Sequence, residues 1–140
     1  MEIVDGDEQA ALNKVVVYGM PYSLRIVMNT SDAPQHFRVV NCRAHDATHK
    51  ATVQLTNWNG CSLNYNLFSD FVYEENHATA QLPTMFRFPM NDVVQFECVM
   101  IICQDQADCN VSHFRNHFSL PAVILLLTDP ATLGYRCPYG

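Results

Sequence analysis

The chain has 140 residues, of which 49% are hydrophobic and 16% are charged, and its formal net charge at pH 7 is -6. This length and composition are typical of one globular domain with its own core. The acidic balance disfavours nucleic acid and anionic membrane surfaces as partners, since both require clustered Lys and Arg side chains. The longest apolar run, residues 120–127, has about eight residues where a membrane-spanning helix needs about twenty, so membrane attachment requires an anchor outside this chain.

Strand patterns dominate the chain, in runs rich in β-branched and aromatic residues. The clear runs are residues 14–18, 22–28, 36–43, 51–56 and 93–103. Two weaker runs, 77–82 and 85–88, flank Pro83, which belongs at an edge or a bend because it lacks a backbone N–H donor. Turn-forming Gly, Pro, Asn and Asp residues separate the runs. The pattern predicts an all-β sandwich or barrel.

These runs also divide the chain. Residues 1–13 are polar and form a predicted linker, and residues 14–109 form the predicted β domain. Residues 110–140 are a divergent C-terminal tail, in which an ordinary buried strand is the favoured interpretation of the apolar run 120–127.

The six cysteines form an even set without any C-x-x-C pair, which argues against zinc knuckles and favours the disulfide framework of an extracellular protein. On the long strand 93–103, alternation places Cys98 on the apolar face. Cys103 is an odd number of residues further on and therefore faces the other way. A tight loop then suffices to join Cys103 to Cys109.

Two N-glycosylation sequons begin at Asn29 and Asn110, which agrees with passage through the secretory pathway. The first residues lack the basic start and apolar core of a signal peptide, so a secreted origin requires upstream sequence. We therefore expect an extracellular protein, secreted or at the cell surface, whose signal peptide and anchor lie outside this chain.

Histidines give the only hint of an enzyme. His45, Asp46 and His49 have the spacing of the H-E-x-x-H helix of zinc metalloproteases, in which two imidazoles converge on one metal. The preceding residues are strand-like, however, Asp46 is shorter than glutamate, and no third ligand stands out. His113 and His117 repeat the spacing, with no sign that the two pairs meet. A strand end followed by a polar turn is the favoured interpretation of His45 and His49, and solvent-facing imidazoles that of the other histidines, so we expect no metal, no cofactor and no enzymatic activity.

Four segments in order carry a family likeness, namely FRVVNCRAHD, VQLTNWNGCSL, MFRFPMNDVVQFECVMIIC and the following Cys109. Over residues 18–109 the chain resembles the C-terminal half of the zona pellucida module, and its A-H-D motif is similar to that of the cuticlin-like invertebrate members. The resemblance implies a secreted immunoglobulin-like β-sandwich. We expect its disulfides to staple two packed sheets.

The resemblance also implies how the cysteines pair. It joins Cys42 to Cys98, and it makes Cys103 and Cys109 the short-loop pair. It gives Cys61 a partner shortly after that loop, but the close-set C-P-x-C ending of the family is absent here, so Cys137 is the partner left by elimination.

One departure from the family pattern lies in the turn that follows the NC motif. The family turn commonly reads A-H-D-G, and Ala47 stands at the glycine position. An alanine there would be strained if the turn required a positive φ. A different turn geometry is therefore one expectation for this chain.

The function implied by the resemblance is structural and non-enzymatic. We expect a module of a secreted or membrane-anchored precursor that assembles into cuticle-like extracellular matrix filaments. Its partners are then other modules of this kind or copies of itself, and the N-terminal half of the module in the full precursor. Receptors carry the same module, so a ligand-binding ectodomain is the alternative, and a zinc enzyme using His45 and His49 ranks third. In the family a hydrophobic propeptide controls assembly, which is the second interpretation of the apolar run 120–127.

Overall fold

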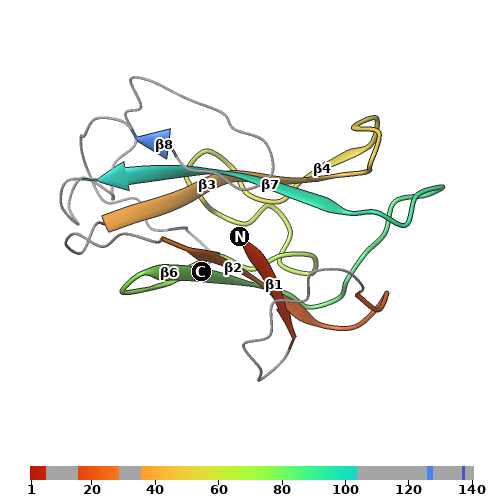
Figure 1. The fold of residues 1–140 in the computed structure, drawn as a ribbon, viewed down its shortest axis with the longest axis horizontal. Helices are drawn as coiled ribbons and strands as arrows, with labels where there is room; N and C mark the ends of the chain where they lie inside the picture. Colours follow the sequence, from red (N-terminus) through yellow and green to blue (C-terminus); the bar gives the residue numbers. More distant parts are fainter. Residues whose placement is uncertain (6–15, 29–35, 104–125, 128–136, 138–140) are drawn as a thin grey trace.

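The computed structural model describes residues 1–5, 16–28, 36–103, 126–127 and 137 (Figure 1). All regular elements in these residues are β-strands, so the predicted all-β class is confirmed. The strands are β1 (Glu2–Asp5), β2 (Tyr22–Val27), β3 (His36–His45), β4 (Thr52–Gln54), β5 (Val72–Glu74), β6 (His77–Leu82), β7 (Gln95–Cys103) and β8 (Leu126–Leu127).

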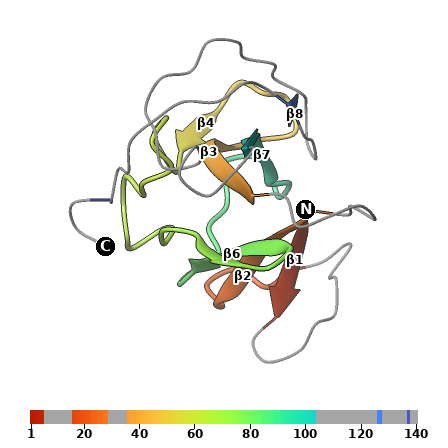
Figure 2. The ribbon, with the colours of Figure 1, turned by 90° about the vertical axis from the view of Figure 1, so that its left-hand side faces the viewer.

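The strands form two sheets that lie one above the other (Figure 2). One sheet has the order β1-β2-β6-β5, and the other has the order β4-β3-β7-β8. Neighbouring strands are antiparallel, apart from β8, which pairs in parallel with β7. The architecture is that of an immunoglobulin-like β-sandwich, as the family resemblance implied.

Alternating side chains of both sheets build the core between them. The small residues Ala80 and Ala78 of β6 pair with Leu24 and Ile26 of β2, so large and small side chains share this face. Burying each large apolar side chain contributes about 1.5–3 kcal/mol. The inward residues of the four longest strands are Tyr22, Leu24, Ile26, Phe37, Val39, Cys42, Ala44, Ala78, Ala80, Leu82, Cys98 and Met100.

Tyr73 of β5 ties the two sheets together at one edge. Its hydroxyl accepts a hydrogen bond from the backbone nitrogen of Val39 in β3 at 3.0 Å and donates to the carbonyl oxygen of the same residue at 3.4 Å. Because β4 pairs only with residues 43–45 of β3, this hydroxyl supplies the partner that a longer β4 would give Val39. Its ring also makes an edge contact with Phe37, with 5.7 Å between the ring centroids.

The environment of this hydroxyl differs from that of the rest of the side chain. Tyr73 is 42% exposed overall, but its hydroxyl lies against the β3 backbone. Desolvation there raises the pKa of Tyr73 and outweighs the hydrogen bond with Val39, which lowers it. The phenol therefore stays protonated and able to donate.

Several predicted strands are present with nearly the predicted limits. The runs 22–28, 36–43, 77–82 and 93–103 correspond to β2, β3, β6 and β7. The run 51–56 is shorter than predicted, since only β4 is regular there. The prediction for 85–88 is wrong, because Phe88 forms only an isolated bridge with Asn91 and the chain turns between them.

Two predictions near the N-terminus are wrong for the residues that the structure describes. Residues 2–5 of the predicted linker form β1, an edge strand whose pairing with β2 buries Val4. Its four residues are too few to show alternation against a polar background. In the predicted strand 14–18, residues 16–18 are irregular, because the chain turns at Gly19, which has a φ of 83°.

Most of the predicted tail, 110–140, lies outside the described residues. Within it, β8 pairs with Ile101 and Ile102 of β7, so the apolar run 120–127 contributes an edge strand of two residues. In the part of the chain that the structure describes, no helix is long and apolar enough to cross a membrane.

We expect the substitution Tyr73→Phe to lower the free energy of unfolding by about 1–3 kcal/mol, because it leaves the Val39 backbone groups without a hydrogen-bond partner. Urea denaturation of the oxidised protein, followed by circular dichroism, measures this loss. The matched control is Tyr18→Phe, at an exposed ring that stacks under Arg87, and it should change stability by less than about 0.5 kcal/mol. Equal losses for the two variants would contradict the role of the hydroxyl.

Candidate functional site

A β-bulge in β3 carries the NC motif. The register of β3 with β7 is regular up to Val40 and resumes at Arg43. Asn41 and Cys42 therefore stand together opposite one residue, Cys98. Asn41 has a φ of 49°, in the left-handed region that asparagine tolerates better than most residues.

The bulge reverses the alternation of side chains along β3. Before it, Phe37 and Val39 point into the core, and after it Cys42 and Ala44 do so. In a regular strand Cys42 would lie on the opposite face from Val39, because the two are an odd number of residues apart. The extra residue, Asn41, is therefore what turns the Cys42 sulfur inward.

The inward Cys42 forms a disulfide with Cys98, and their Cα atoms are 4.0 Å apart. The pairing implied by the family resemblance is thus present in the structure. Its role differs from the expectation, because β3 and β7 are neighbours in one sheet and the bond does not staple the two sheets together. Crosslinking residues 56 apart stabilises the fold by about 4 kcal/mol, mainly by restricting the unfolded chain.

The loop after β4 satisfies the backbone of the bulge. The Cys42 nitrogen donates to Oγ1 of Thr56 at 2.8 Å, and the Cys42 carbonyl oxygen accepts from the nitrogen of Leu55 at 2.8 Å. The Asn41 nitrogen donates to the carbonyl oxygen of Asn57 at 2.9 Å. Thr56 is fully buried, so its hydroxyl replaces the ladder partner that the bulge removes.

Gly60 lets this loop pack directly on β3. A β-carbon at Gly60 would lie 2.7 Å from the Val39 carbonyl oxygen, and its φ of 77° also favours glycine. The Oδ1 atom of Asn57 accepts from the backbone nitrogen of Cys61 at 3.0 Å and holds the turn closed. This geometry presents Cys61 to Cys137, with which it forms the second disulfide, the pairing that elimination had left.

The remaining described cysteine is Cys103, which is disulfide-bonded and buried. Its position an odd number of residues after Cys98 on regular β7 gives it the opposite face, as predicted. Its predicted partner, Cys109, lies outside the described residues. No cysteine among the described residues is free.

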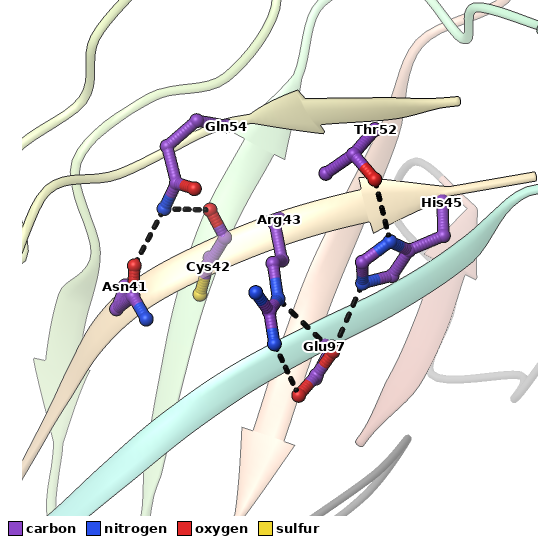
Figure 3. Close-up of polar contacts among 7 residues, drawn as sticks. All are labelled: Asn41, Cys42, Arg43, His45, Thr52, Gln54 and Glu97. Carbon is purple, nitrogen blue, oxygen red and sulfur yellow. Dashed lines mark hydrogen bonds and ion pairs between the residues drawn. The ribbon is translucent and has the colours of Figure 1, made fainter. Parts of the chain in front are cut away.

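On the outer face of the same sheet, Glu97 of β7 binds two side chains of β3 (Figure 3). Its carboxylate accepts hydrogen bonds from Nε and Nη2 of Arg43, both at 3.0 Å. The second partner is Nε2 of His45, at 2.9 Å. The Nδ1 atom of His45 lies 3.0 Å from Oγ1 of Thr52 in β4, so one polar chain crosses three strands. The fork of Arg43 matches the carboxylate in a two-point geometry, which makes this a strong ion pair.

Gln54 of β4 extends this polar surface to the bulge. Its Nε2 atom donates to Oδ1 of Asn41 at 2.7 Å and lies 3.2 Å from the carbonyl oxygen of Cys42 (Figure 3). The carbonyl oxygen of Thr56 accepts from the same nitrogen at 2.8 Å. One amide thereby holds β4, the bulge and the following loop in a fixed relation.

Asp46 organises the turn between β3 and β4. Its carboxylate accepts hydrogen bonds from Oγ1 of Thr48 at 2.6 Å, from the nitrogen of Lys50 at 2.9 Å and from the nitrogen of Ala51 at 3.1 Å. The hydrogen bond from Thr48 is the main cause that lowers the pKa of Asp46, while desolvation opposes it and the two backbone donors add to it.

The turn does not require a positive φ at Ala47, so its alanine is not strained. Ala47 has an ordinary negative φ, and the positive φ falls instead on His49, at 56°. The ring of His49 lies 4.9 Å from that of His45, measured between centroids. The A-H-D motif therefore ends in a turn whose backbone is bound by the aspartate, and glycine is not required after the aspartate.

The partners of His45 account for both of its ring nitrogens, which lie near Thr52 and Glu97. A metal at this ring would have to displace one of those contacts. The described residues contain no group of three or more His, Cys, Asp or Glu side chains arranged to hold a metal ion. His113 and His117 lie outside the described residues, as do the sequon residues Asn29 and Asn110.

Comparisons of the chain with protein-family models, curated proteins and solved structures found no match. The resemblance to the zona pellucida module therefore stays a prediction drawn from motifs. The candidate site is defined by its own geometry, as a disulfide at a bulge on the inner face of one sheet and a polar chain on the outer face.

Sequence reasoning missed Glu97, Thr56 and Gly60 as parts of this site. Glu97 carried a usable signal, because an acidic residue inside an apolar strand must face outward and needs a cation on a neighbouring strand. Thr56 and Gly60 carried none, since their roles depend on how the loop after β4 returns to β3.

We expect Asn41→Val to cost about 1–2 kcal/mol more stability than Asn41→Gly, because valine is strained at a positive φ and glycine is not. Urea denaturation of the oxidised variants measures the difference. The matched control is the pair Ser23→Val and Ser23→Gly, on the regular strand β2, where valine should be the more stable of the two. The same ranking at both positions would contradict the bulge.

We expect the stability of the protein to fall relative to Asp46→Asn as the pH drops below about 4. Because the pKa of Asp46 is lower in the folded state than in the unfolded state, its carboxylate stabilises the fold fully at any pH above the unfolded-state pKa. Protonation removes this stabilisation as the pH falls through the folded-state pKa. Denaturation midpoints between pH 7 and pH 2 measure it. Thr48→Val removes the main cause of the shift and should flatten the dependence, whereas an unchanged profile in that variant would contradict the assignment.

Proposed function

We propose that this chain is a non-enzymatic structural module of a secreted or membrane-anchored precursor, and that the precursor assembles into extracellular matrix filaments of the cuticle type. The observation that carries the proposal is the buried Cys42–Cys98 disulfide, which stands on a bulge built for it at Asn41. The N-C and F-x-C motifs that carry these cysteines belong to the segments that resemble the zona pellucida module.

The chemistry of the sandwich supports a mechanical role. Disulfides persist in oxidising surroundings, so the oxidised cysteines are compatible with an extracellular protein. On the outer face, the charged and polar groups of Arg43, Glu97 and His45 bind one another and cross-brace the strands. Groups committed to one another in this way stiffen a sheet.

The edges of the two sheets support controlled assembly. The edge strands β1, β4, β5 and β8 each have four residues or fewer, and short edges limit indiscriminate pairing with other chains. At one edge, β8 pairs with Ile101 and Ile102 of β7. A strand from another module could pair with β7 at this edge only by displacing β8. The apolar run 120–127 is therefore a candidate regulator of the assembly of this module with copies of itself or with other modules.

Secretion of the full precursor from eukaryotic cells, followed by negative-stain electron microscopy of the processed material, tests the proposal. We expect filaments from the native precursor. We expect their loss in the double variant Cys42→Ala and Cys98→Ala, because the β3–β7 pair loses its crosslink. Soluble monomers as the only product of the native precursor would refute the filament role and would favour the ligand-binding ectodomain.

A further inference from the structure

Met90 occupies a backbone position that favours glycine. The nitrogen of Asn91 donates to the carbonyl oxygen of Phe88 at 3.3 Å, which closes a turn with Pro89 and Met90 at its centre. Met90 has a φ of 69°. Proline followed by a residue with positive φ is the pattern of a type II turn, whose second central position is normally glycine or asparagine. A methionine there carries a conformational cost.

The side chain of Met90 is not buried and so contributes no packing to the fold that would offset this cost. Its exposure is 102%, so it reaches fully into solvent from the tip of the turn. The other methionines with strong burial show the contrast, since Met28, Met85 and Met100 are 3%, 2% and 5% exposed and belong to the core. Met20 is intermediate, at 52%. The fold therefore explains the buried methionines and leaves the Met90 thioether unexplained.

We propose that Met90 is a site of reversible oxidation, at which hydrogen peroxide converts the exposed thioether into a sulfoxide. A lone pair of the Met90 sulfur attacks one peroxide oxygen, an S–O bond forms and the O–O bond breaks. The departing oxygen takes up the proton of the transferred hydroxyl and leaves as water, so sulfur loses two electrons and peroxide gains them. The product is polar and chiral where the thioether was apolar.

The surroundings of the turn determine what the oxidation changes. Val93, three residues further on, is 46% exposed, and its nitrogen donates to Oδ1 of Asn91 at 2.9 Å. The turn thus presents an apolar thioether three residues before an exposed aliphatic residue, and oxidation to a sulfoxide turns that thioether into a strong hydrogen-bond acceptor. The disulfides are already oxidised, so peroxide leaves the described cysteines unchanged. This inference is independent of the proposed structural function.

Limited treatment of the intact oxidised chain with hydrogen peroxide, followed by peptide mapping with mass spectrometry, tests the proposal. We expect Met90 to oxidise first, at least about ten-fold faster than Met28, Met85 and Met100, with Met20 between them. Methionine sulfoxide reductases should then restore Met90. In denaturant without reductant the rates should converge. A Met90 rate no higher than that of the buried methionines in the folded chain would overturn the assignment.

Two variants separate oxidation from any role in folding. Met90→Leu keeps an apolar side chain and should remove the first oxygen added without changing the rates at the other methionines. Met90→Gly should raise the urea midpoint of unfolding, since glycine suits the positive φ. A lower midpoint for Met90→Gly would show that the side chain serves the fold, and this result would also overturn the inference.

Discussion

A disulfide between neighbouring strands requires both sulfurs to lie on the same side of the sheet, and the bulge at Asn41 meets that requirement here. Without the extra residue, the alternation set by Phe37 and Val39 would continue along β3, and Cys42 would lie on the outer face of the sheet, away from Cys98. The loop after β4 supports the bulge, because Thr56 binds the backbone nitrogen of Cys42 and Gly60 lets the loop approach the backbone of β3 closely. The site is one connected arrangement in which each part depends on the register shift.

The two faces of the β4-β3-β7 sheet have different tasks. The inner face packs the Cys42–Cys98 disulfide among apolar side chains, where it contributes to the core as well as to the crosslink. On the outer face, polar contacts link Thr52 to His45 and His45 to Glu97, and Arg43 of β3 binds the same glutamate. Since these polar groups bind one another across strands and the disulfide joins β3 to β7, the two strands are linked on both faces of the sheet.

Strand prediction succeeded where the chain has long alternating runs, as in β2, β3 and β7. It failed where a short segment becomes a strand only because it pairs with a neighbouring strand. β1 is short and acquires its strand character from pairing with β2, and β5 acquires it from β6. The run 85–88 shows the reverse, because its aromatic alternation resembles a strand although Met85 bonds to Gly19 and Met20 in the neighbouring loop. Alternation of apolar and polar residues indicates that one side of a segment is buried, and it does not indicate which backbone groups form hydrogen bonds.

The sequence by itself determined the all-β class, the inward position of Cys98 and the oxidised state of the described cysteines, because these follow from side-chain period and cysteine count. Only the tertiary structure decided that Cys42 and Cys98 lie in one sheet, and that Glu97 joins the two side chains of β3. The physical reason is that strand order and register depend on contacts between segments about fifty residues apart, and no local pattern specifies which strands become neighbours.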